Sequence, residues 1–449
     1  MIGVYDASRQ LNVASIIYLG LFALQHRGQE SCGISVQDGD KVITHKDIGL
    51  VVDNFDSEIL ARLKGSHGIG HVRYAPHGCS GRENTQPIEV RYRDGMMALA
   101  HNGNLTNTVK LRREMADSGA VFIGDTDTEL VLKRLCRYLA ADATVLQAVM
   151  DTMQDIRGAY AIVATLPEMI VGFRDPHGLR PLCLGKYKDA YILASESCAF
   201  SSIGAEFIRD IRPGEIVIID DRGLHSHQTP PAPDSKLCIF EYVYFARPDS
   251  YMDEASIRRA REEAGRILAQ EHPVEADLVI GAPDSALTAA VGFARASGIP
   301  FGHGLIRSRY VARTFIQPTQ EMRDAAVRLK FSVLRDEVEN KRIVMVDDSI
   351  VRGTTTSVIV QMLKDAGATE VHMRISSPPV KFPCYYGIDT ATANQLIASH
   401  MSEAEICRKI GADSLGYLSI EGLRKTPVGV CLGLCDACFT GNYFLMPEE

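Results

Sequence analysis

The stretch that most restricts the fold of this chain is KRIVMVDDSIVRGTTTSVIVQMLKDAGAT (341–369). It joins an apolar run, two adjacent aspartates, a turn rich in Gly and Thr, and a periodic helical segment that ends in Gly. A second unit of this kind joins ADLVIGAPDS to ALTAAVGFARASG (276–298). Apolar strands without polar alternation, each followed by a helix, predict a parallel sheet that helices cover on both faces.

Residues 1–225 have a different pattern. Short Val- and Ile-rich runs bounded by Gly, Asp and Asn indicate strands, and helical periodicity occurs only at 13–25 and 127–154. The proline-rich segment HSHQTPPAPDSK (225–236) then reads as a linker. We therefore predict two domains, stacked sheets between helices over 1–230 and an α/β domain over 231–449.

The composition excludes several classes of protein. A length of 449 residues suits two domains, and a net charge of −8 provides no basic field for nucleic acid or an anionic membrane surface. No apolar run reaches the roughly 18 residues of a membrane span, and the N-terminus lacks a signal-peptide pattern. We expect a cytoplasmic protein without nucleic-acid or membrane partners.

The two aspartates, Asp347 and Asp348, fall at the carboxyl end of a predicted parallel strand, where open α/β sheets bind ligands. The following turn, 349–356, offers backbone N–H groups, hydroxyls and a helix N-terminus, which together favour a phosphate. The order of residues is not that of a P-loop. Acids beside a phosphate turn suit a sugar phosphate whose hydroxyls they hold directly or through Mg²⁺. The alternative is a helix N-cap with surplus acids.

This motif resembles the signature of type I phosphoribosyltransferases, which bind phosphoribosyl pyrophosphate (PRPP). The resemblance implies that the two aspartates bind the ribose hydroxyls and, with Ser285 of GAPDSA, one Mg²⁺ per subunit. It also implies a 5-phosphate cradle and a basic loop within 305–330 that faces the pyrophosphate; a solvated helix face is the other interpretation of this basic segment. The implied PRPP-binding residues are Asp347, Asp348, Ser349, Val351, Arg352, Gly353, Thr354, Thr355, Arg309 and Arg313.

Four motifs of the first half occur in a recognisable order: GLFALQHRGQESCGI, GHVRYAPHG, LAHNGNLTN and GDTDTELV. Together they resemble the class II, N-terminal-nucleophile glutamine amidotransferase domain. The resemblance implies stacked antiparallel sheets between helices. It also implies that Arg73 binds the glutamine α-carboxylate, that Asp127 binds its α-ammonium, and that Asn102 and Gly103 form the oxyanion hole.

The two halves in this order resemble the amidophosphoribosyltransferase family over essentially the whole chain. The implied reaction converts glutamine, PRPP and water to 5-phosphoribosylamine, glutamate and pyrophosphate, the first step of purine synthesis. Purine nucleotide inhibitors and a homotetramer are further implications. Two rivals are a PRPP-sensing regulator without catalysis and an inactive paralogue.

The start of the chain departs from the family pattern. The nucleophile of this class is an N-terminal cysteine whose own α-amine acts as base, but the chain begins MIGVYDASRQ. Either IGVY matches the second half of the family's start, after a truncated gene start, or Ile2-Gly3 occupies the Cys-Gly position. We expect the first. As written, the polypeptide should use ammonia and leave glutamine intact.

Eleven cysteines are unusual for a chain of this class, and most read as buried thiols. The pair Cys435 and Cys438 has the C-x₂-C spacing common in zinc and iron–sulfur sites. One branch of the family carries a structural [4Fe–4S] cluster, and its cysteine motifs are matched here, with Cys431 outside the pattern. The implied ligands are Cys238, Cys384, Cys435 and Cys438. Reduced thiols without metal are the alternative.

Overall fold

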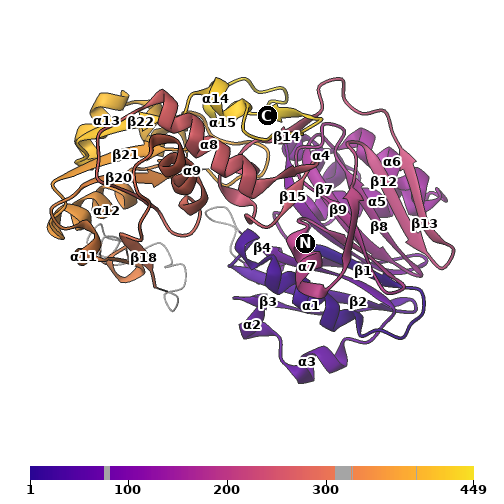
Figure 1. The fold of residues 1–449 in the computed structure, drawn as a ribbon. Helices are drawn as coiled ribbons and strands as arrows, with labels where there is room; N and C mark the ends of the chain where they lie inside the picture. Colours follow the sequence, from indigo (N-terminus) through magenta and orange to yellow (C-terminus); the bar gives the residue numbers. More distant parts are fainter. Residues whose placement is uncertain (75–80, 309–324, 326, 391, 449) are drawn as a thin grey trace.

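The computed structural model describes residues 1–74, 81–308, 325, 327–390 and 392–448. Figure 1 shows two lobes: an N-terminal lobe rich in strands and a C-terminal lobe in which strands alternate with helices. The yellow C-terminal segment returns from the second lobe toward the first and lies beside β14 (Lys236–Cys238).

Two antiparallel sheets form the N-terminal lobe. The first has the order β11-β9-β10-β1-β4-β2-β3 and the second the order β13-β12-β8-β7-β6-β5. The strands of the first sheet are β1 (Ile2–Asp6), β2 (Ser31–Asp38), β3 (Lys41–Ile48), β4 (His67–Arg73), β9 (Cys183–Tyr187), β10 (Ala190–Ala194) and β11 (Glu206–Asp210). Those of the second are β5 (Ile88–Tyr92), β6 (Gly95–Leu105), β7 (Gly158–Leu166), β8 (Met169–Arg174), β12 (Glu215–Asp220) and β13 (Gly223–Gln228).

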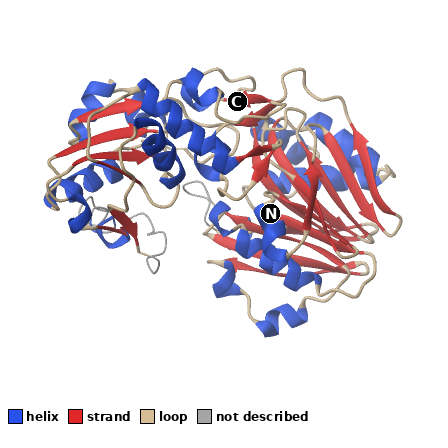
Figure 2. Cartoon of the chain, viewed as in Figure 1, coloured by secondary structure: helices blue, strands red, loops and turns tan. Residues whose placement is uncertain are grey.

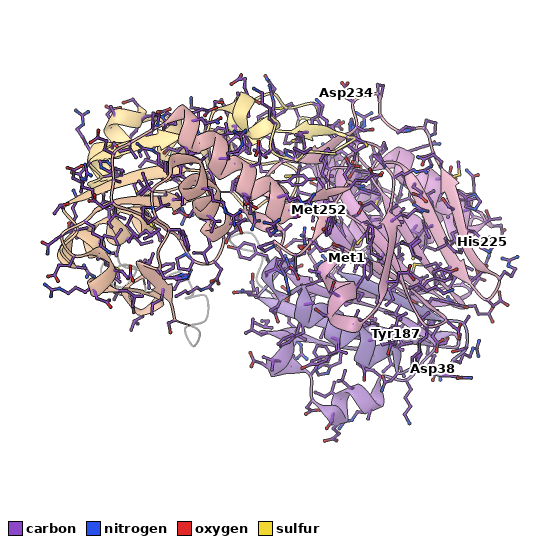
Figure 3. All side chains as sticks on the ribbon, in the orientation of Figure 1. Met1, Asp38, Tyr187, His225, Asp234 and Met252 are labelled. Atoms are coloured by element: carbon purple, nitrogen blue, oxygen red, sulfur yellow. The ribbon has the colours of Figure 1, made fainter. Side chains whose placement is uncertain are left out.

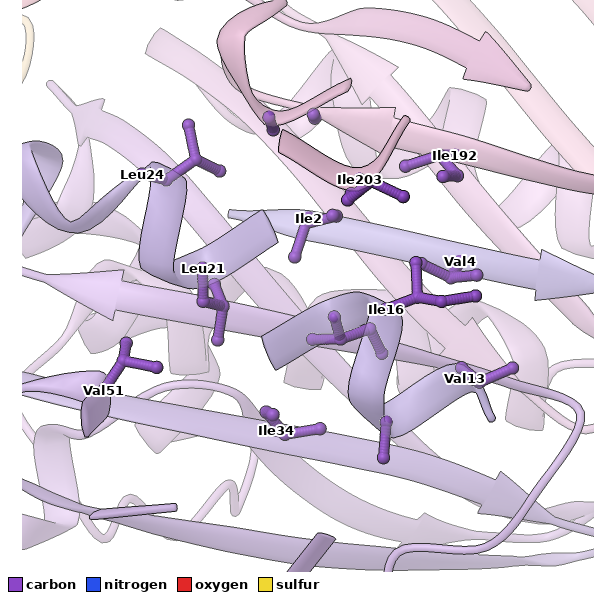
Figure 4. Packing of buried hydrophobic residues seen from close by; sticks show 14 of the residues in the cluster. Ile2, Val4, Val13, Ile16, Leu21, Leu24, Ile34, Val51, Ile192 and Ile203 are labelled. Carbon is purple, nitrogen blue, oxygen red and sulfur yellow. The ribbon is translucent and has the colours of Figure 1, made fainter. Parts of the chain in front are cut away.

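Helices cover the outer faces of both sheets (Figure 2). Ile2 and Val4 of β1 pack against the helix α1 (Val13–Ala23), as Figure 4 shows. Met1 and Tyr5 instead belong to the core between the two sheets. The alternation of β1 thus divides its side chains between two layers, and the lobe has four layers, helix–sheet–sheet–helix. The remaining helices are α2 (Val51–Asn54), α3 (Ser57–Arg62), α4 (Thr108–Asp117), α5 (Asp127–Ala140), α6 (Val145–Asp155) and α7 (Cys198–Ile203).

The C-terminal lobe contains a parallel sheet in the order β17-β20-β21-β22. Its apolar strands pack against α8 and α9 on one face and α12 and α13 on the other. Gly265 of α8 and Gly292 of α9 let these helices approach closely, because a Cβ at either position would lie within 2 Å of a backbone oxygen. The bounds are α8 (Ile257–Glu271), β17 (Leu278–Gly281), α9 (Leu287–Ser297), β18 (Leu305–Arg307), β19 (Phe331–Val333), α11 (Arg335–Val338), β20 (Arg342–Asp347), α12 (Thr354–Asp365), β21 (Glu370–Ile375), α13 (Glu403–Ile410), β22 (Ser414–Tyr417), α14 (Ile420–Arg424), β23 (Gly433–Cys435) and α15 (Ala437–Thr440).

The predicted fold class is confirmed: stacked antiparallel sheets are followed by a parallel sheet between helices. The antiparallel sheets use residues 2–228 and the parallel sheet uses residues 278–417, while the boundary at 230/231 stays a prediction. One pairing links the end of the linker to the far end of the chain, since β14, which begins at Lys236, pairs with β23 in parallel. Within the described residues, no helix is both long and apolar enough to cross a membrane.

Candidate active sites

Asp347 is the last residue of β20, and Asp348 follows it at the carboxyl edge of the parallel sheet. Ser285 follows the adjacent strand β17, and its hydroxyl donates to Asp348 Oδ2. The hydroxyl of Ser349 donates to Asp348 Oδ1 at 2.6 Å, and Asp348 N donates to Asp347 Oδ1 at 2.9 Å. The structure therefore brings together the three residues predicted to hold Mg²⁺, although they come from two separate strand–helix units.

The two carboxylates carry more negative charge than their surroundings neutralise. Burial, and then the charge of Asp348, raise the pKa of Asp347 well above its usual range, and Lys330 offsets this only in part. Burial also raises the pKa of Asp348, against the opposing hydrogen bonds of its two serines and the charge of Arg261. Such a pair favours a bound cation or hydrogen-bond donors from a ligand.

The helix after the aspartates has an open N-terminus. Its N-cap is Gly353, with φ of +77°, and no side chain caps α12. Thr354 and Thr355 are exposed, so their hydroxyls and the first N–H groups of the helix face solvent together. The arrangement suits an anion, since the N-terminal end of a helix has a partial positive charge.

Of the remaining residues predicted to contact PRPP, the structure describes Val351 and Arg352 but neither of the two arginines of the basic loop. Arg352 is exposed and donates to Gln395 Oε1 at 2.7 Å, while Val351 O accepts from Ile397 N at 2.9 Å. Both contacts fix the turn against the segment that precedes α13. Arg309 and Arg313 lie outside the described residues, so their predicted role stays a prediction.

The predicted glutamine-binding residues lie at the end of the N-terminal sandwich. Arg73 is the last residue of β4, and Asp127 is the first of α5. Asp127 accepts from Leu105 N at 3.0 Å and pairs with His101 Nδ1 at 3.3 Å. Although burial opposes it, these contacts hold the pKa of Asp127 below its usual value. Asp127 therefore stays anionic at neutral pH, as recognition of an α-ammonium requires.

Asn102 and Gly103 lie on β6 beside these residues. Gly103 has φ of +148°, and a Cβ there would meet Ala159 O at 2.0 Å, so only glycine fits. The amide nitrogen of Asn102 is buried and has no hydrogen-bond partner among the described residues. A buried donor without a partner costs free energy unless a ligand accepts its hydrogen bond. In an oxyanion hole, the oxygen of the substrate is that acceptor.

Sequence reasoning missed two side chains that support this site. Gln86 is buried, accepts from His101 N at 2.7 Å and donates to Thr128 Oγ1 at 2.9 Å, which ties β6 to α5. Arg180, also buried, donates to Asn102 Oδ1 at 3.1 Å. Neither lies in a motif, and the only available signal was a polar residue beside an apolar stretch.

Met1 lies near the junction of the two lobes (Figure 3). Its α-amine donates to Ser195 Oγ at 3.1 Å, and burial followed by the charge of Arg27 lowers the pKa of this amine to about 4. Burial first, and then the charge of this amine, lower the pKa of His71, whose ring hydrogen-bonds to the backbone of His101. The end of β1 is thus close to the strand that carries Asn102.

Four cysteines from three separate segments of the chain line one cavity of about 20 Å³. The register of β14 and β23 places Cys238 opposite Cys435, while Cys384 and Cys438 complete the lining. Burial raises the pKa of all four thiols, with Arg180 partly offsetting this at Cys238 and Cys384. Cys431 is exposed and outside the set. Across the residues that the structure describes, no three His, Cys, Asp or Glu side chains converge closely enough to hold a single metal ion.

Comparisons with known proteins agree along nearly the full chain. A family model described as a glutamine amidotransferase domain matches residues 71–202. An amidophosphoribosyltransferase of Synechococcus elongatus is 49% identical over 442 residues, covering 97% of this chain and 90% of that protein. The Bacillus subtilis amidophosphoribosyltransferase is 48% identical, covering 98% of this chain and 93% of that protein.

Solved structures give the same result. A glutamine PRPP amidotransferase from B. subtilis, solved with ADP and GMP, aligns with a TM-score of 0.92 and 46% identity, covering all of this chain and 98% of that one. An allosteric regulatory enzyme of purine biosynthesis aligns with a TM-score of 0.93 and 46% identity, covering all of this chain and 96% of that one. With relatives this similar over both lobes, the chain belongs to the amidophosphoribosyltransferase family.

Proposed function

We propose that this chain forms 5-phosphoribosylamine and pyrophosphate from PRPP in its C-terminal lobe. The observation that carries the proposal is the meeting of Ser285, Asp347 and Asp348 beside the uncapped N-terminus of α12. The aspartates would hold the ribose hydroxyls, and the turn from Ser349 to Thr355 would hold the 5-phosphate.

The nitrogen source is the second part of the proposal. In the N-terminal lobe, Arg73 and Asp127 would bind glutamine through its α-carboxylate and α-ammonium groups, with Asn102 and Gly103 at the γ-carbonyl. A polypeptide that begins at Met1 has no thiol on its first residue. If expressed from this Met1, the polypeptide would lack the nucleophile of its class, and we would expect that polypeptide to bind glutamine without hydrolysing it and to use ammonia instead.

The test is pyrophosphate release from PRPP and Mg²⁺ under anaerobic conditions, with ammonium or glutamine as the nitrogen donor. We expect release with ammonium alone. Release with both donors would contradict the ammonia-only part. Silence with both would favour the PRPP-sensing regulator or the inactive paralogue, and PRPP binding without turnover would then identify the regulator.

Mg²⁺ fits the residues at the carboxyl edge of the sheet, because hard cations prefer oxygen ligands and two crowded carboxylates provide them. Ser285, Asp347 and Asp348 would hold one ion per subunit together with the substrate. The ion would neutralise charge that develops on the pyrophosphate leaving group. Dependence of the ammonia reaction on added Mg²⁺ after treatment with EDTA tests this proposal.

A [4Fe–4S] cluster is proposed at the cavity lined by Cys238, Cys384, Cys435 and Cys438. Four thiols around one cavity match the Cys₄ ligation of such clusters, whose ligands stand further apart than those of a single ion. Tyr386 N donates to Cys384 Sγ at 3.3 Å, a contact that would stabilise a thiolate. The cluster would be structural.

Iron and sulfide analysis after anaerobic purification tests the cluster. We expect iron and sulfide in the parent protein and in Cys431→Ser, the matched control, and loss of both in Cys384→Ser. A folded, iron-free parent would leave the reduced-thiol interpretation.

We propose the regulation and assembly of this chain from its similarity to its relatives. The B. subtilis structure holds ADP and GMP, which supports purine nucleotides as inhibitors of this chain. A homotetramer in the cytoplasm is our proposal for its assembly and location. Inhibition of ammonia-dependent turnover by GMP and the mass from light scattering test the first two points.

A further inference from the structure

The side-chain amide of Asn102 has a defined orientation. A guanidinium can donate hydrogen bonds but cannot accept them, so the group facing Arg180 Nη2 has to be the amide oxygen. The amide nitrogen then points away from Arg180, buried and without a partner among the described residues. A rotation of 180° would place two donors against each other and remove the donor from the γ-carbonyl position.

Arg180 is itself held by the other lobe. Its side chain is 1% exposed, and Nη2 lies 3.4 Å from Glu241 Oε1. The guanidinium also lies over the ring of Phe245, 5.5 Å from its centroid. Glu241 and Phe245 are the ends of one short π-helical segment, η3 (Glu241–Phe245), which lies beyond the linker.

Glu241 is fixed in turn by Arg27, which donates to its two carboxylate oxygens at 2.7 and 3.1 Å. Arg27 also pairs with Glu196, so the segment is joined to the first lobe by a buried ionic network. A second contact crosses near the same place, because Asn104 Nδ2 donates to Tyr385 O at 3.0 Å. The strand that carries the oxyanion hole is thus braced from the C-terminal lobe at two points.

We propose that Arg180, held by Glu241 and Phe245, is a positioning residue that locks the Asn102 amide with its nitrogen toward the γ-carbonyl of bound glutamine. This rests on the proposed function, in which Asn102 forms the oxyanion hole. Arg180 does not touch the substrate; it acts through Asn102. The glutamine site is consequently completed by residues on both sides of the linker.

Equilibrium binding tests the proposal on a polypeptide expressed from Met1, because without an N-terminal cysteine that polypeptide should bind glutamine without consuming it. The probes are L-glutamine and L-norvaline, which has the same α-groups but no γ-amide. In Arg180→Met we expect the glutamine Kd to rise about 3- to 10-fold, the loss of one neutral hydrogen bond. The norvaline Kd should stay unchanged, since Arg73 and Asp127 are intact.

Arg209→Met is the matched control. Arg209 forms a bidentate ion pair with Glu215 in the same lobe, at 2.6 and 2.8 Å, and touches neither Asn102 nor η3. Its loss should leave the ratio of the glutamine and norvaline affinities unchanged. Equal weakening of both ligands in Arg180→Met would mean general damage to the lobe and would overturn the proposal, as would unchanged binding of both.

A second measurement does not depend on glutamine binding. In protein labelled with ¹⁵N-asparagine, the side-chain amide signals of Asn102 are identified by their loss in Asn102→Asp. We expect these signals to shift or broaden in Arg180→Met and to stay in place in Arg209→Met; unshifted signals in both would refute the inference. If the parent bound no glutamine, the proposed role of the site would fail, and these signals would still decide whether Arg180 orients Asn102.

Discussion

Buried carboxylates at the lobe junction are paired with arginines, whereas those at the edge of the parallel sheet lie beside each other. At the lobe junction, Glu196 and Glu241 are fully buried and face Arg27 and Arg180, so each charge has a partner of opposite sign. At the edge of the parallel sheet, Asp347 and Asp348 face each other and two hydroxyls. The first arrangement needs no ligand to balance its charges, whereas the second would be stabilised by a bound cation or by hydrogen-bond donors of a ligand.

The largest expected effect is a loss of stability when a buried ion pair at the lobe junction is broken. Glu241→Ala leaves the buried guanidinium of Arg180 without its carboxylate and leaves Arg27 with Glu196 alone. We therefore expect a loss of about 3–5 kcal/mol in the free energy of unfolding. Urea unfolding under anaerobic conditions measures it. Glu58→Ala, which breaks an ion pair whose side chains are about 70% exposed, should cost less than about 1 kcal/mol. Similar losses in both variants would remove the distinction.

The next largest effect should be a loss of activity when a carboxylate at the edge of the parallel sheet is neutralised. Asp348→Asn removes a charge that would hold the ribose and Mg²⁺, and we expect at least a roughly 100-fold slower release of pyrophosphate with ammonium, the usual scale for one electrostatic contact. Asp365→Asn on the exposed side of α12 is the control and should change the rate less than about twofold. A rate near that of the parent for Asp348→Asn would exclude the site.

The third prediction concerns stability at the same place. Because the pKa of Asp347 is raised in the folded state, its ionised form opposes folding at neutral pH. In metal-free buffer at pH 7, Asp347→Asn should therefore unfold with a free energy about 1–2 kcal/mol higher than the parent. A destabilised variant would show that the aspartate is satisfied within the apo protein, as Glu241 is.

The smallest expected effect is a pH slope. Despite burial, Arg27 and His26 hold the pKa of Glu196 far below its usual value. A depressed carboxyl contributes stability above its unfolded pKa near 4.5, and this is lost as pH falls further. Between pH 4.5 and 3.5, Glu196→Gln should reduce the slope of unfolding free energy against pH by up to about 1.4 kcal/mol per unit. Parallel curves for parent and variant would contradict the ion pair.

The carboxylates at the edge of the parallel sheet could be predicted well from the sequence, and the buried ion pairs at the lobe junction could not. The strand–Asp–Asp–turn–helix pattern is contiguous, and parallel strands meet at one edge, so Ser285 and Asp348 were predictable as neighbours. The four cysteines were placed only through the family resemblance, since no spacing rule joins Cys238 to Cys384. Arg27, Arg180 and Glu241 were not identified, because a lone charged residue in an apolar stretch does not indicate its partner across a linker.

The pairing of β14 with β23 has a consequence for how the chain is made. Cys238 leaves the ribosome about 200 residues before Cys438, which at usual elongation rates is about 10–40 s. Cys238 and the segment η3 spend that interval without the strand β23, whereas Cys384, only 54 residues before Cys438, spends just the last part of it. Closure of the cysteine cavity is therefore a late event of synthesis, and a chain stalled between residues 384 and 433 would have only two of the four cysteines that line it.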